Sequence, residues 1–131
     1  MNIRQSIELD HISHQNPIPM GSKIGNLVFS SGISGRDPLT QKVPVNPEEQ
    51  AKLMFQNIRN FMEKSGGTPE HIAKVTLFIK DRKLRDYVNK EWLEMFPNPD
   101  SRPARHAIDY NLSGDLLFQV ELIAVLQERT I

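Results

Sequence analysis

The sequence predicts an α+β fold in which two helices pack on the same face of a β-sheet. Three observations lead to this class. Two segments repeat apolar residues at helical spacing, the other apolar runs alternate as strands do, and Gly and Pro fall between these segments. The 131 residues suit one domain, and no repeat or linker divides them. We therefore expect residues 1–131 to form a single domain.

The N-terminal part is expected to contain two strands and two loops. Residues 3–9 can form an edge strand, and 14–19 should be a loop because two prolines there exclude a helix. The Gly-Asn pair at 25–26 suits a tight turn before a strand at 27–30. The glycine-rich segment 32–40 is expected to be irregular.

The first helix is predicted to begin after Asn46 and to end at Gly66 or Gly67. The Asn46 side chain can accept hydrogen bonds from first-turn amides, and Pro47 has the backbone angle of a first helical residue. Glu49 stands where a capping-box acid would. Either glycine can end the helix in a left-handed conformation. The apolar stripe of this helix would be Ala51, Met54, Phe55, Ile58, Phe61 and Met62.

The second half of the chain is expected to add three strands and a second helix. One further short turn should follow Thr68, and alternation predicts a strand over 75–79. Two prolines at 97 and 99 would stop the second helix. Two final strands, 104–110 and 117–124, flank a turn. The stripe of the second helix would be Leu84, Val88, Trp92, Met95 and Phe96.

Alternation assigns the side chains of the final strands to opposite faces of the sheet. Arg105, Ala107 and Asp109 should share one face, opposite to His106. In the last strand, one face carries the four apolar side chains from Phe118 to Ala124, and the other carries Gln119, Glu121 and Ile123. If both helices cover one face, the other is an uncovered, partly apolar surface, which is typical of an interaction surface.

Composition excludes several classes of function. The 16 basic and 16 acidic residues give zero net charge, so no basic field favours nucleic acid or an anionic membrane. The absence of cysteine excludes a thiol nucleophile, and the four histidines have no metal-ligand spacing. No apolar run suggests a signal peptide or a membrane span. We expect a cytoplasmic protein without a metal or other cofactor.

Arg105 is the first candidate for a functional residue. It begins a strand directly after Pro103 and Ala104, and its planar fork of donors fits a carboxylate. It could therefore anchor a small acidic ligand. The alternative is a surface arginine paired with Asp109, and residue types alone favour this alternative.

Several segments, in order, resemble the reactive intermediate deaminase family (RidA, also called YjgF). They include the Gly-Asn strand with its closing Ser-Gly at 23–32, the strand and exit at 74–81, and the Pro-Ala-Arg start at 103–105 with the closing strand at 117–124. The resemblance runs from about Pro17 to Ala124. It implies a chorismate-mutase-like mixed sheet and a homotrimer with ligand clefts between subunits.

The resemblance also implies two catalytic positions. The family's arginine in Pro-Ala-Arg binds the substrate carboxylate, and Arg105 matches it. The family's glutamate positions or activates the water that hydrolyses an imine, and Gln119 stands in its place. A carboxylate can accept a proton from water, whereas an amide can only orient the water. Glu121 would lie on the same face about 7 Å further along the strand, but a structural ion pair is its favoured interpretation.

Other positions are expected to line the substrate pocket. Ile18 stands where a tyrosine often closes the pocket, Ile33 follows the Ser-Gly in place of a glutamine, and Ala107 replaces a frequent cysteine. The backbone of Gly32 could bind a carboxylate or carbonyl oxygen. Asn89, on the second helix, could reach the cleft.

The implied activity is hydrolysis of small carboxylate-bearing imines or enamines to keto acid and ammonia. The loss of the glutamate keeps two alternatives open: a non-catalytic carboxylate sensor on the same fold, or a different hydrolase or lyase activity in the cleft. Nucleic-acid cleavage, also attributed to the family, is the weakest candidate at zero net charge.

Overall fold

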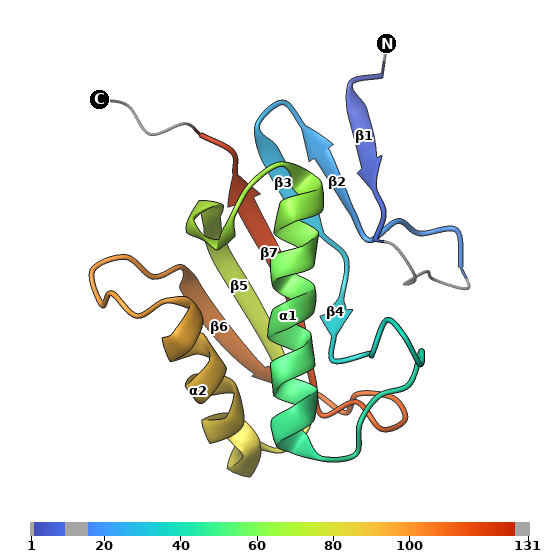
Figure 1. Cartoon of the computed structure of the whole chain (residues 1–131), viewed down its shortest axis with the longest axis vertical. Coiled ribbons are helices and arrows are strands. Elements are labelled where there is room, and N and C mark those ends of the chain that lie inside the picture. Colours follow the sequence, from blue (N-terminus) through green and yellow to red (C-terminus); the bar gives the residue numbers. More distant parts are fainter. Residues whose placement is uncertain (1, 10–15, 128–131) are drawn as a thin grey trace.

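The computed structural model describes residues 2–9 and 16–127, so part of the expected loop at 14–19 lies outside the described residues. Within these residues, two helices lie in front of one sheet (Figure 1). The helices are α1 (Pro47–Ser65) and α2 (Arg85–Met95), with short 3-10 helices at Pro69–His71 and Arg82–Leu84. The strands are β1 (Arg4–Ile7), β2 (Gly21–Ile24), β3 (Leu27–Ser30), β4 (Ile33–Ser34), β5 (Ile72–Ile79), β6 (Ala104–Asp109) and β7 (Phe118–Val125).

The sheet is mixed, and its strand order is β1-β2-β3-β7-β5-β6, with β4 also paired to β7. Only the β5–β6 pair is parallel among these strands, and α2 makes the connection between them. Both helices pack on one face, so the predicted α+β class is confirmed. The last two strands of the chain are not neighbours, because β5 lies between β6 and β7.

The strands β2 and β4 were not predicted. The sequence of β2, Gly-Ser-Lys-Ile, has no apolar alternation, and β4 is only two residues long. Gly21 begins β2 because the ring of Phe61 from α1 and the carbonyl of Phe29 occupy the space that a Cβ atom would need. Close packing of a helix against backbone therefore selects this residue, and a pattern of hydrophobicity does not reveal it.

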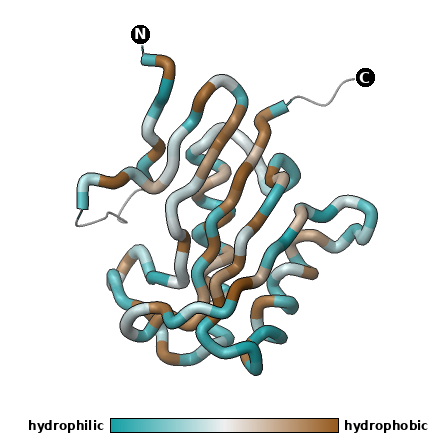
Figure 2. Tube along the Cα trace, turned by 180° about the vertical axis from the view of Figure 1, so that it is seen from behind, coloured by the Kyte–Doolittle hydropathy of each residue, from teal (hydrophilic) through white to brown (hydrophobic). Residues whose placement is uncertain are grey.

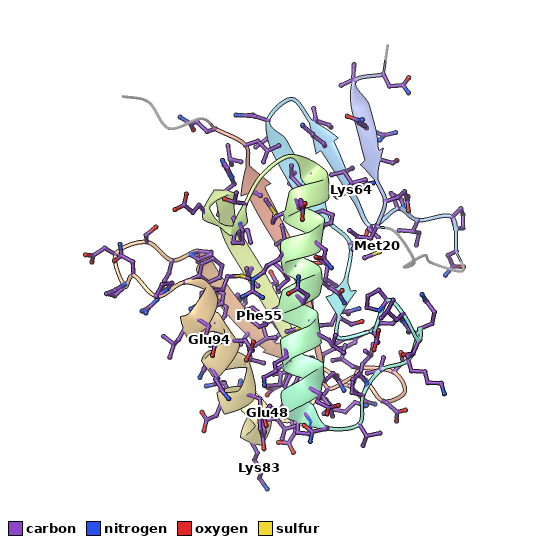
Figure 3. All side chains as sticks on the ribbon, viewed as in Figure 1. Met20, Glu48, Phe55, Lys64, Lys83 and Glu94 are labelled. Carbon is purple, nitrogen blue, oxygen red and sulfur yellow. The ribbon has the colours of Figure 1, made fainter. Side chains whose placement is uncertain are left out.

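The predicted boundaries of α1 are confirmed. The Asn46 Oδ1 accepts hydrogen bonds from the amides of Glu48 at 2.8 Å and Glu49 at 3.2 Å. Gly66 ends the helix with φ 92°, a left-handed conformation that suits glycine. The predicted stripe is buried, and it includes Phe55, which Figure 3 labels beside α1. None of the helices within 2–9 and 16–127 has the length and apolarity needed to cross a membrane.

The face of the sheet away from the helices is exposed and partly apolar. In β7 the apolar side chains from Phe118 to Ala124 are buried under the helices, and Gln119, Glu121 and Ile123 take the opposite face, as predicted. Figure 2 views this face and shows hydrophobic stretches along the central strands. Phe29 is 40% exposed and Ile123 is 37% exposed, although they are paired neighbours in β3 and β7.

Candidate functional site

The side chain of Arg105 is held by α2. Its Nη2 donates a hydrogen bond of 2.8 Å to Asn89 Oδ1, and its guanidinium lies 4.9 Å from the centre of the Trp92 ring. Trp92 is itself fixed, since its ring packs edge-on against Phe96 at 4.7 Å between centroids. A polar contact and a cation–π contact thus orient one guanidinium from the same helix.

Burial shapes the electrostatics of Arg105. Removal from water lowers the pKa of Arg105, and the positive charge of Arg85 lowers it further. Arginine nevertheless stays charged in proteins, so the group is a partly desolvated cation. Its Nη1 is buried and has no hydrogen-bond partner among the described residues. A buried donor left unpaired costs about 1–3 kcal/mol, which a bound anion would recover.

The alternative partner suggested for Arg105 is not used. The two Asp109 oxygens accept hydrogen bonds from Arg82 Nε at 2.6 and 2.8 Å, on the exposed end of β6. The interpretation of Arg105 as a surface arginine paired with Asp109 is therefore wrong. A neighbour on the 3-10 helix before α2 neutralises this aspartate, which leaves Arg105 without a carboxylate partner among the described residues.

Ala107 and Arg85 border the same region. Ala107 shares the helix-facing side of β6 with Arg105, as predicted, because their β5 partners Leu77 and Val75 are buried under the helices. Sequence reasoning missed Arg85, which begins α2 and whose buried Nε has no hydrogen-bond partner in the part of the chain that the structure describes. The spacing of Arg85, Asn89 and Trp92 at i, i+4 and i+7 could have placed it on the same helix face.

Gly32 and Gln119 form a second group. A Cβ atom on Gly32 would lie 2.5 Å from Gln119 Nε2, so glycine allows the amide to lie directly over the backbone. Gln119 is paired with Ser34 in β4 and with Phe78 in β5. These contacts place the amide beside the backbone segment that was expected to bind a carboxylate or carbonyl oxygen.

The two groups lie on opposite faces of one sheet. Arg105 pairs in register with Val75, which faces the helices, whereas Gln119 pairs with Phe78, three residues further along β5 and on the open face. Strand alternation therefore points Arg105 and Gln119 in opposite directions. A single subunit does not bring the two predicted catalytic residues together.

Two other predicted pocket residues also lie apart. Ile33 is 1% exposed, because β4 directs its side chain into the core beside Val120, so a ligand can meet only its backbone. This corrects the expectation that the Ile33 side chain lines the pocket. Ile18 is 49% exposed in the segment before β2.

Glu121 lies on the open face at a hollow of about 270 Å³ whose lining also includes Lys74, Thr76 and Phe29. No ion pair holds Glu121 among the residues that the structure describes. The predicted structural ion pair is therefore not seen within the subunit. In the same described ranges, no group of three or more His, Cys, Asp or Glu side chains could hold a metal ion.

Known proteins share both the sequence pattern and the fold. Residues 12–126 match the family described as Endoribonuclease L-PSP. A RutC family protein from Haemophilus influenzae is 35% identical over 114 residues, which cover 83% of this chain and 86% of the relative. A 2-iminobutanoate/2-iminopropanoate deaminase from Escherichia coli K12 is 31% identical over 113 residues, covering 83% and 87%.

Solved structures agree with these relatives. The crystal structure of the YjgF gene product from E. coli superposes with a TM-score of 0.85 at 27% identity, covering 94% of this chain and 99% of that one. The structure of E. coli TdcF with bound serine gives a TM-score of 0.84 at 27% identity, covering 92% and 98%. The chain therefore belongs to the Endoribonuclease L-PSP family and, within it, to the RidA/YjgF proteins.

Proposed function

We propose that this protein hydrolyses small carboxylate-bearing imines or enamines to 2-oxo acids and ammonia, with Arg105 binding the carboxylate. One observation carries the proposal: within residues 2–9 and 16–127, a partly buried guanidinium, fixed by Asn89 and Trp92, has an unpaired donor and no carboxylate partner. A charge-assisted, two-donor contact is the arrangement that binds carboxylates best. The E. coli relative named a 2-iminobutanoate/2-iminopropanoate deaminase supports the reaction class.

The proposed site is completed between subunits of a homotrimer. Arg105 and Gln119 point away from each other within one chain, so a cleft with both needs a second copy. The open face offers apolar side chains, Phe29 and Ile123 among them, for such an assembly. Zero net charge opposes self-association only weakly.

In the proposed reaction, water adds to the carbon of the C=N bond, and a proton moves to nitrogen. The resulting carbinolamine loses ammonia as its C–N bond breaks and a C=O bond forms. The Gln119 amide can orient the water through hydrogen bonds but cannot accept its proton. Orientation alone can still accelerate an intrinsically easy hydrolysis, with a general base adding about 10²–10⁴-fold in other enzymes.

The proposal is tested by ammonia release from freshly generated 2-iminobutanoate. We expect turnover by the wild type, a loss of about 10²-fold in kcat/KM in Arg105→Ala, and a partial recovery in Arg105→Lys, which keeps the charge but not the fork. Gln119→Glu should raise kcat. Arg4→Ala, which removes an exposed arginine from the edge strand β1, is the matched control. Unchanged turnover in Arg105→Ala would rule out the proposed anchor.

A non-catalytic carboxylate-binding protein is the second candidate, and the amide at Gln119 favours it. This function predicts no turnover by the wild type. It also predicts a rise in Tm with small carboxylates that is lost in Arg105→Ala, because a ligand that binds only the folded state stabilises it. Turnover by the wild type would exclude this candidate.

A further inference from the structure

Arg85 places a second cation beside Arg105. It stands one helical turn before Asn89 on α2, and residues four apart lie next to each other on a helix face. Asn89 accepts its hydrogen bond from Arg105, so the helix face that bears Arg85 is also the face that holds Arg105. The influence of the Arg85 charge on the pKa of Arg105 agrees with this proximity.

Neither guanidinium has an acidic partner among the described residues. The only carboxylate on the helix-facing side of β6, Asp109, is occupied by Arg82 at 2.6 Å. Arg85 Nε and Arg105 Nη1 are both buried donors, and neither has an acceptor within the described ranges. Two like charges held close together, each with an unused donor, favour a ligand that supplies two negative groups.

The neighbouring residue on β6 is small, and solvent reaches both arginines. Ala107, two residues after Arg105 on the same side of β6, presents only a methyl group towards the helix. Both arginine side chains are partly exposed, so a ligand can reach them from solvent. If either guanidinium rotates slightly towards an anion, its unpaired donor forms a charge-assisted hydrogen bond. That donor has no existing hydrogen bond to lose.

We propose that this pair of arginines selects a dicarboxylate, with one carboxylate on Arg105 and the second on Arg85. The inference rests on the proposed function for its reaction, and it narrows the substrate to 2-imino dicarboxylic acids with a short carbon chain. Their hydrolysis has the same balance as before: one water enters, the C=N bond becomes C=O, and ammonia leaves. Arg85 then determines specificity, whereas Arg105 serves every substrate.

The test compares the wild type with Arg85→Met, which keeps a long side chain but removes the charge and donors. Lys83→Met is the control, since it removes a cation two residues earlier from a side chain that points away from the protein (Figure 3). Ammonia release is measured with 2-iminosuccinate and 2-iminobutanoate, and Tm shifts with succinate and butanoate. The ratio of kcat/KM for the dicarboxylate over the monocarboxylate should fall at least tenfold in Arg85→Met but not in Lys83→Met.

The two measurements separate this inference from the proposed function. If no imine is hydrolysed but succinate raises the wild-type Tm more than butanoate, and Arg85→Met abolishes this difference, the proposed activity fails and dicarboxylate selection stands. If the wild type shows no preference for the dicarboxylate in either assay, or if Arg85→Met keeps the preference, the inference is overturned even where deamination is observed.

Discussion

The side chain of Gln50, in the first turn of α1, links the segment before this helix to the loop before β7. Replacing it should strongly lower the free energy of unfolding. Its side chain is fully buried, at 0% exposure. Nε2 donates to the carbonyls of Pro44 at 2.8 Å and Asp115 at 3.1 Å, and Oε1 accepts from the amide of Leu117 at 2.7 Å. Leu117 directly precedes β7, so this one side chain also sets the start of the strand that carries Gln119.

The magnitude follows from these three bonds. Each contributes about 0.5–1.5 kcal/mol net, and backbone groups left buried without partners cost about 1–3 kcal/mol each. Gln50→Leu keeps the approximate side-chain volume but leaves all three backbone groups without a hydrogen-bond partner. We therefore expect a loss of about 3 kcal/mol in the free energy of unfolding. Gln56→Leu on the same helix is the matched control, because the Gln56 side chain is exposed and bonds to one exposed neighbour on the helix, Asn60, so its loss should stay below about 0.5 kcal/mol.

Urea denaturation of both variants, followed by circular dichroism, measures the two losses on one scale. A loss below about 1 kcal/mol in Gln50→Leu would refute the reasoning, because the removal of three buried hydrogen bonds that link these segments should cost more than that. Gln50→Glu adds a further check. It keeps an acceptor for the Leu117 amide but offers no donor to the two carbonyls and buries a charge, so it should destabilise at least as much as the leucine.

Two further predictions concern a buried acid and the open face. Burial, followed by the nearby charge of Glu94, raises the pKa of Glu91, so the folded state holds this proton more tightly than the unfolded state. The stability that this group contributes is therefore lost as pH rises above the usual glutamate range, where the carboxyl ionises. Glu91→Gln, which cannot ionise, should raise Tm at pH 7 but not at pH 4. A gain of equal size at both pH values would contradict this assignment. On the open face, Phe29→Glu should reduce the mass measured by light scattering from that of the proposed trimer towards the 15.0 kDa of one chain, while Leu39→Glu, in an exposed loop, should not. A trimeric mass for both the wild type and Phe29→Glu would contradict the proposed subunit contact at Phe29.

Local chemistry allowed much of the fold to be predicted from the sequence. Asn46, Pro47 and Gly66 determine the ends of α1 through cap and backbone preferences that act within a few residues. The alternation in β7 fixed which side chains face the core. The polar β2 and the two-residue β4 were missed because their pairing partners, β3 and β7, give them their structure, and no pattern within them does.

The site was only partly predictable, because it depends on which strand lies beside which. The residue pattern and the resemblance named Arg105 and Gln119, but the register of both against β5 shows that one subunit keeps them on opposite faces. Arg85 was not predicted as a site residue, for a related reason. A charged residue at the start of a helix is ordinarily a solvated one, and it gains importance only because α2 packs over β6 and brings it to the face that holds Arg105. In the proposed site, specificity depends on the contacts across α2 and β6, and the Arg85→Met experiment tests the residue that the sequence pattern did not reveal.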